Sequence, residues 1–264
     1  KQYNTVIGYQ AMRLNESGDG NVAVGMSCLG SLTSGHQNTS VGKYSMFTNT
    51  TGSYNTAIGD TALYKNTTAG YSVAVGYEAL YNNTKENMTA VGYRALYNNT
   101  TGSQNVAVGR CALLNNSTGY YNTAIGYDSL YYNTTGYQNT AVGWLALQDV
   151  NTGYSNTAIG ESSGRNITSG FRNTFTGQRS GYTCTTGDYN QGLGSGSLYY
   201  LTTGDYNVAM GVNSCYKLTT NHGNVGIGHQ ALFNNTSSYI VAVGMNSQYS
   251  NSTGLRNTSL GNES

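Results

Sequence analysis

The sequence predicts an all-β fold, a parallel β-solenoid (β-roll) of about sixteen coils, each built by one 17-residue repeat. Three observations predict it: one glycine recurs at a fixed spacing, an aliphatic residue precedes nearly every copy, and the unit is too short for a helical hairpin, an ankyrin repeat or a propeller blade. Positions are counted below from this residue, the ruler glycine. Its copies are Gly8, Gly25, Gly42, Gly59, Gly76, Gly92, Gly109, Gly126, Gly143, Gly160, Gly177, Gly194, Gly211, Gly228, Gly244 and Gly261.

Composition narrows the class of protein. The 264 residues include 36 Gly, 25 Tyr and no Pro, and only 9% are charged while 38% are apolar, whereas disordered chains are rich in charge and Pro. A net charge of +1 argues against a nucleic-acid partner. The longest apolar run, Ile240-Val241-Ala242-Val243, is far too short for a membrane span.

Each coil is expected to contain a strand that ends at the ruler glycine. Because side chains alternate along a strand, Thr123 and Ile125 point one way and Ala124 the other. We expect the aliphatic column at minus one to be the buried seam of a parallel sheet, because such seams are rich in Val and Ile. A second short strand is predicted after the glycine, with small residues at plus three and Leu at plus four, as in Ala62 and Leu63.

Two glycines per coil are expected to reverse the chain. The ruler glycine and a second glycine at plus ten are both predicted to have a positive φ. The second set is Gly18, Gly35, Gly52, Gly102, Gly119, Gly136, Gly153, Gly170, Gly187, Gly204 and Gly254. Asn at minus four is predicted to form a coil-to-coil amide ladder. This column includes Asn21, Asn38, Asn55, Asn105, Asn122, Asn139 and Asn156.

Residues 1–264 are expected to form a single uninterrupted repeat domain without visible caps. Solenoids normally end in caps that cover strand edges and apolar core. The repeat is therefore expected to assemble end to end or to belong to a longer array, and the alternative is a segment of a larger protein with caps elsewhere. With coils about 4.8 Å apart, the repeats predict a rod on the order of 75 Å long.

The corner at plus six to plus nine is rich in Asn-x-Ser/Thr sequences, the acceptor pattern for N-glycosylation. A solenoid corner presents an amide on an accessible turn, but Asn and Thr also suit turns for structural reasons alone. Both interpretations remain open from the sequence. The candidate acceptors are Asn15, Asn49, Asn66, Asn82, Asn98, Asn99, Asn115, Asn116, Asn133, Asn166, Asn234, Asn235 and Asn251.

An aromatic column at plus five predicts a ladder of stacked rings, which stabilises a sheet. If exposed beside Asn and Thr, the same rings could bind sugars, so the sequence leaves both roles open. The tyrosines of this ladder are Tyr64, Tyr81, Tyr97, Tyr131, Tyr182, Tyr199, Tyr216 and Tyr249, with Phe47 and Phe233 in the same column.

The sequence gives little support for catalysis. The three histidines, His36, His222 and His229, have no nucleophile recurring beside them, and the Asp residues lack the calcium pattern of repeat proteins. The cysteines Cys28, Cys111, Cys184 and Cys215 lie at different repeat positions, which fits buried apolar residues better than disulfides or a zinc site. We expect no enzyme, no cofactor and no metal.

The units Asn-Thr-Ala-Ile-Gly and Asn-Val-Ala-Val-Gly, each followed by a small residue three later, resemble the head repeats of YadA-type trimeric autotransporter adhesins. Related repeats are similar to those of fibre proteins that carry an endosialidase-type chaperone. The resemblance implies a left-handed β-roll, often trimeric, in a surface-exposed fibre. The corner at Asn133-Thr134-Thr135 is longer than the usual turn of that family, and Tyr is more abundant.

These observations lead us to expect a structural fibre segment that is extracellular or lies on a cell or virion surface, with copies of itself and covalent glycans as partners. The alternative is an adhesin or receptor-binding head that takes a surface glycan or matrix as ligand. An ice-binding surface is a further alternative, because Thr5, Thr39, Thr56, Thr89 and Thr123 share the minus-three column. Val22, Val73 and Val106 interrupt that column, which we interpret as an inward position that accepts Thr or Val.

Overall fold

The computed structural model describes residues 3–264, which form two compact units, one that ends at Thr135 and one that comprises Gly136–Ser264. Each unit is a stack of coils, and each coil holds one three-residue strand followed by turns. None of the described residues lies in a helix that is long and apolar enough to cross a membrane.

The strands recur at the repeat period in both units. The first unit contains β1 (Thr5–Ile7), β2 (Val22–Val24), β3 (Thr39–Val41), β4 (Thr56–Ile58), β5 (Val73–Val75), β6 (Thr89–Val91), β7 (Val106–Val108) and β8 (Thr123–Ile125). The second contains β9 (Thr140–Val142), β10 (Thr157–Ile159), β11 (Thr174–Thr176), β12 (Gln191–Leu193), β13 (Val208–Met210), β14 (Val225–Ile227), β15 (Val241–Val243) and β16 (Thr258–Leu260).

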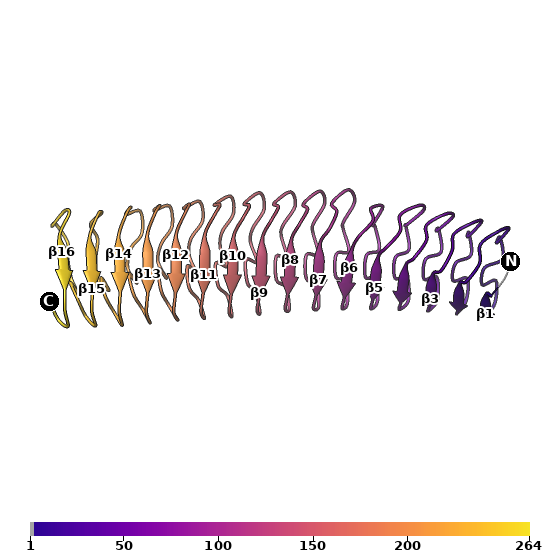
Figure 1. The fold of residues 1–264 in the computed structure, drawn as a ribbon, viewed down its shortest axis with the longest axis horizontal. Helices are drawn as coiled ribbons and strands as arrows, with labels where there is room; N and C mark the ends of the chain where they lie inside the picture. Colours follow the sequence, from indigo (N-terminus) through magenta and orange to yellow (C-terminus); the bar gives the residue numbers. More distant parts are fainter. Residues whose placement is uncertain (1–2) are drawn as a thin grey trace. The chain divides into compact units, whose positions relative to one another are not determined.

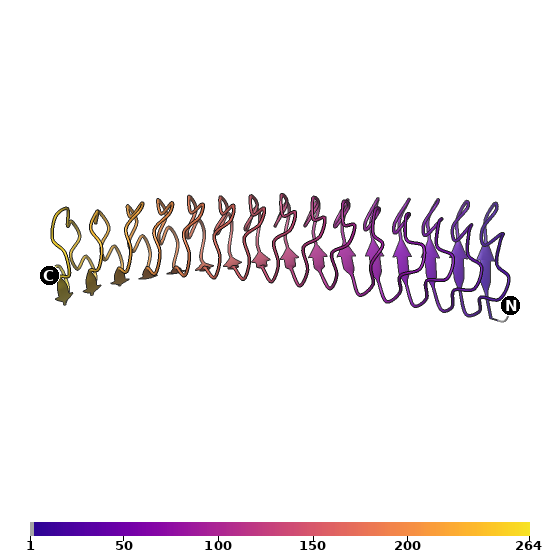
Figure 2. The same cartoon turned by 90° about the horizontal axis from the view of Figure 1, so that it is seen from above.

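Within each unit, consecutive strands pair in parallel and in register (Figure 1). Ala57 of β4, for example, pairs with Ser40 of β3 and with Ala74 of β5. Within a unit, the strands line one side of the coils and the turns lie on the other (Figure 2). The predicted fold class, a parallel β-solenoid with a 17-residue repeat, is therefore confirmed.

The prediction of which strand face is buried is wrong. The middle residue of every strand from β2 to β15 is buried, and it is small in nearly all of them, as at Ala23 and Ala57, whereas the minus-one column is half-buried or exposed. Ile58 and Leu193 are 41% and 49% exposed. In most coils the plus-three residue packs directly against the strand and leaves its middle position little space, as where the Ser45 hydroxyl donates to the carbonyl of Ala57 at 3.2 Å.

The minus-three column lies on the same outer face as the minus-one column. Its Thr and Val residues are half-buried or exposed, which corrects their assignment as inward positions. The outer face of the sheet in each unit is therefore a regular array of Thr, Val and Ile side chains.

Among residues 3–264, no second strand follows the ruler glycine. The residues at plus three and plus four are buried as expected, as at Ala62 and Leu63, but they lie in turns. The residues at plus two and plus four have left-handed backbone conformations, with φ of 54° at Thr61 and 52° at Leu63. A backbone that alternates in this way cannot extend as a strand.

The two glycine positions serve different purposes. The ruler glycine has a positive φ, such as 139° at Gly59, as predicted. The glycine at plus ten does not, so that part of the prediction is wrong. A Cβ at Gly35 would lie 2.3 Å from the carbonyl oxygen of Gly52, so this position requires glycine because neighbouring coils approach closely.

The Asn ladder at minus four is confirmed. In the first unit the backbone N–H of Asn38 donates to Oδ1 of Asn21 at 2.9 Å, and Nδ2 of Asn38 donates to the carbonyl of Gly52 at 2.9 Å. These side chains are fully buried. Each amide therefore satisfies backbone groups of the next coil that would otherwise be buried without a partner.

One coil of the second unit fills its core differently. Phe175 of β11 occupies the inward position that Ala holds in most strands, and its ring is fully buried. The plus-four position, which holds Leu in most coils, is Gly164 or Gly181 in the two coils around this ring. The ring fills the space that the leucine side chains would occupy, and it also contacts Gly192. A Cβ at Gly181 would lie 2.6 Å from ring atoms of Phe175.

Candidate functional site

The Asn side chains at plus seven point into the solenoid. Asn49, Asn66, Asn99, Asn116, Asn133 and Asn235 are all fully buried. Nδ2 of Asn116 donates to Oδ1 of Asn99 at 2.7 Å and to the carbonyl of Gly119 at 3.0 Å. This column is a second interior amide ladder. Six of the thirteen candidate acceptors therefore have no room for a glycan in the folded chain.

Sequence patterns contained a signal for this burial. In other coils the plus-seven position holds Leu32, Val150, Ile167, Leu201 or Leu218, and all of these are fully buried. A column that accepts either Asn or an aliphatic residue indicates an inward position in which the amide has a hydrogen-bonding partner.

The remaining candidates are half-buried. Asn15 and Asn251 hold plus seven in two further coils, and each bonds to the glycine three residues later. The plus-six candidates are Asn82, Asn98, Asn115, Asn166 and Asn234.

The plus-six amides partly engage one another. Nδ2 of Asn82 donates to Oδ1 of Asn98 at 3.3 Å, and Nδ2 of Asn98 donates to Oδ1 of Asn115 at 3.0 Å. Occupancy of any of these sites by a glycan stays a prediction.

The plus-five aromatic residues stack as the sequence predicts. In the first unit the ring centroids of Tyr64 and Tyr81 are 5.1 Å apart, and those of Tyr81 and Tyr97 are 5.2 Å apart. The second unit holds a corresponding ladder of Tyr182, Tyr199, Tyr216, Phe233 and Tyr249. Tyr131 instead contacts Tyr132 edge-on at 4.7 Å.

Stacking limits what the ladder can bind. Each ring face inside a ladder is covered by the ring of the next coil, with planes only 4° apart for Tyr64 and Tyr81. Edges and hydroxyl groups remain available. A sugar that packs on an aromatic face therefore has no place within the ladder.

Two further aromatic ladders were not predicted. Tyr54 stacks on Tyr71 at 5.0 Å in the first unit, and in the second Tyr137, Tyr154 and Phe171 stack at 4.8 Å. These rings lie five or six residues before the ruler glycine. The signal was the recurrence of Tyr at those two positions, which varies between coils and is easily overlooked.

Asp, His and Ser side chains align in one column at minus six. In the first unit the backbone N–H of Asp19 donates to Nδ1 of His36 at 3.3 Å, and that of His36 donates to Oγ of Ser53 at 3.0 Å. The second unit repeats this order with Asp205, His222 and Ser238.

These side chains cap backbone groups of neighbouring coils. The serine hydroxyl accepts from the backbone of the histidine residue rather than facing its imidazole, so it is not placed for activation as a nucleophile. Within residues 3–264, no three His, Cys, Asp or Glu side chains gather as a metal site.

The cysteines are buried and unpaired, which confirms the prediction from their positions. Burial raises the pKa of Cys184 and of Cys215 to about 12, and that of Cys28 to about 11. These thiols are therefore protonated and unreactive at neutral pH.

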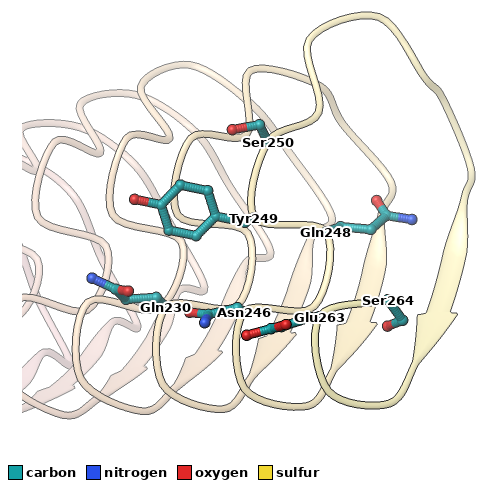
Figure 3. Close-up of a pocket in the computed structure, with 7 residues that line it drawn as sticks. All are labelled: Gln230, Asn246, Gln248, Tyr249, Ser250, Glu263 and Ser264. Atoms are coloured by element: carbon teal, nitrogen blue, oxygen red, sulfur yellow. The ribbon is translucent and has the colours of Figure 1, made fainter.

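A surface depression of about 620 Å³ lies at the coils of β14 to β16 (Figure 3). Gln230, Asn246 and Glu263, the plus-two residues of three successive coils, form one side of it. Gln248 and Tyr249 also line it. Amide, hydroxyl and carboxylate groups are mixed here, without a buried charge or a paired acid and base.

Comparison with protein-family models, with curated proteins and with solved structures finds no match for this chain.

Proposed function

We propose that this chain is a structural segment of an extracellular or virion-surface fibre that presents a repetitive exterior and assembles with copies of itself. The observation that carries the proposal is the role of the recurring side chains. Two interior Asn ladders and the stacked aromatic ladders all connect one coil to the next. Such contacts stiffen a stack of coils rather than form a cleft for a small substrate.

The resemblance of the Asn-Thr-Ala-Ile-Gly units to YadA-type head repeats and to chaperone-bearing fibre proteins supports the same proposal. In this reading the β-roll is left-handed, and N-linked glycans are added at the plus-six asparagines. The half-buried state of that column supports this narrower set of acceptors.

Electron microscopy of the native material tests the proposal. Continuous filaments, or coils continuing within a longer fibre, are expected. Compact isolated particles with shielded ends would overturn it.

An adhesin role is the second candidate, and the exposed indole of Trp144, which lies outside the ladders, favours it. Trp144 is 52% exposed. Tyr93 does not qualify, because its ring is stacked on Tyr77 at 5.5 Å and carries the guanidinium groups of Arg94 and Arg110 at 5.2 and 5.7 Å. Saturable binding to a glycan array that is lost in Trp144→Ala and retained in Tyr81→Phe would favour this role.

A further inference from the structure

The plus-nine position carries a hydroxyl group in every 17-residue coil. Of the two shortened coils, one holds Lys85 there and the other holds Ser237, which is buried. The residues are Ser17, Ser34, Thr51, Thr68, Thr101, Thr118, Thr135, Thr152, Ser169, Thr186, Thr203, Thr220 and Thr253.

The preceding position, plus eight, has a structural reason for its hydroxyl. Thr50 Oγ1 donates to the carbonyl of Thr67 at 3.0 Å, and Thr202 Oγ1 donates to that of Thr219 at 3.1 Å. Even so, this column accepts replacements such as Glu16 and Asn151. A hydroxyl with a structural role is therefore replaceable in this repeat.

The plus-nine hydroxyl has no such role. Thr51, Thr101 and Thr203 are exposed, and their hydroxyl groups make no hydrogen bond to any residue in the described range 3–264. Their backbones are held in place, because the N–H of Thr101 donates to the carbonyl of Ser117 at 3.0 Å. Each coil thus presents an unbonded hydroxyl group on a fixed turn.

Turn formation does not explain this column. Asn, Asp and Gly suit turns at least as well as Ser and Thr, yet none of them holds plus nine in a 17-residue coil. The feature that all thirteen residues share is a hydroxyl group, and twelve of the thirteen residues are exposed.

We propose that the plus-nine hydroxyl groups are the acceptors for O-linked sugars. In the transfer, the Ser or Thr oxygen attacks the anomeric carbon of a nucleotide-activated sugar. The bond from that carbon to the phosphate oxygen breaks, the nucleoside diphosphate leaves, and the hydroxyl proton passes to a base of the transferase. This inference goes beyond the fibre proposal and does not depend on filament formation.

Surface chemistry supports the inference. Only 9% of residues are charged, whereas soluble globular domains average about 25%. The outer sheet face also exposes aliphatic side chains such as Ile58 and Leu193. Sugars on the corners would supply the missing hydration. Because neighbouring acceptors are about 4.8 Å apart, short or unevenly spaced sugars fit better than branched ones.

Mass spectrometry of the chain purified from its native source tests the inference, with fragmentation that keeps sugars attached. Sugars are expected on plus-nine residues such as Thr203 and not on the plus-eight neighbour Thr202. Expressed in the same source, Thr203→Val is expected to lose the sugar of that corner, whereas Thr202→Val keeps it.

An unmodified polypeptide mass, or sugars confined to plus eight or to Asn, would overturn the inference. Imaging the same sample separates it from the fibre proposal. Filaments without sugars would contradict the inference of O-linked sugars and leave the fibre proposal intact. Isolated particles that carry the sugars would contradict the fibre proposal and leave the inference intact.

Discussion

Replacing Phe175 by Ala tests the packing of the second unit most severely. The ring is fully buried, and it is bordered by Gly164, Gly181 and Gly192, which have no side chains that could move into the vacated space. Loss of ring burial costs about 2–3 kcal/mol. A ring-sized void adds about 2 kcal/mol at about 24 cal/mol per Å³. The expected loss of stability is therefore about 4–5 kcal/mol.

Hydrogen exchange of the amides around β10 to β12 is the appropriate assay, because a stack of repeats opens locally. Phe171→Ala is the matched control. That ring is half-buried and stacks on Tyr154 at 4.8 Å, so its loss should cost only about 1 kcal/mol. Equal effects of the two substitutions would refute the reasoning.

The reverse change gives a second check. Gly181→Leu alone should destabilise the chain by roughly 1–3 kcal/mol, because its Cβ would lie 2.6 Å from the Phe175 ring. Combined with Phe175→Ala and Gly164→Leu, the same substitution restores the Ala and Leu pattern of other coils and should recover most of the stability. A triple variant no more stable than Phe175→Ala would contradict this size complementarity.

Three other predictions concern the ladder, the thiols and the outer sheet face. Asn190→Ala should lower the free energy of unfolding by about 2–5 kcal/mol, because the N–H of Asn207 and the carbonyl of Gly204 lose their hydrogen-bonding partner. A loss below about 1 kcal/mol in chemical unfolding would contradict the structural role of the ladder. Burial raises the pKa of Cys184 from 9.0 to about 12, so the unfolded chain ionises first and stability should fall by about 1.4 kcal/mol per pH unit between those values. In the Cys184→Ala variant this fall of stability with rising pH should be absent. If the variant and the original chain lose stability equally over this pH range, Cys184 is not buried as described. The fibre account expects no thermal hysteresis, and a clear gap between freezing and melting points would favour ice binding by the outward Thr and Val columns.

The period, the ruler glycine and the minus-four Asn ladder could be predicted because each depends on backbone geometry that repeats in every coil. Which strand face is buried could not be predicted from β-propensity alone. Val and Ile usually mark the buried side of a parallel sheet, but here the inward strand position takes residues of about the size of Ala23 or Ser40, except in β11, where neighbouring glycines leave space for Phe175. The alternation of small and branched residues is visible in the sequence. Which of these two sets of side chains faces inward depends on the width of the interior.

The candidate site was predicted less well for a related reason. The acceptor pattern at Asn99 or Asn116 reports local sequence, while burial depends on which way the corner turns. Likewise, the glycine at Gly35 is required by contact with Gly52 in the next coil and not by its own conformation. Contacts between coils leave no trace in the sequence of a single repeat.

Cryo-electron microscopy of the native material tests the central claim most directly. The account predicts filaments in which the coils of this chain continue at a spacing of about 4.8 Å. Discrete particles whose terminal coils are shielded from other copies would contradict it.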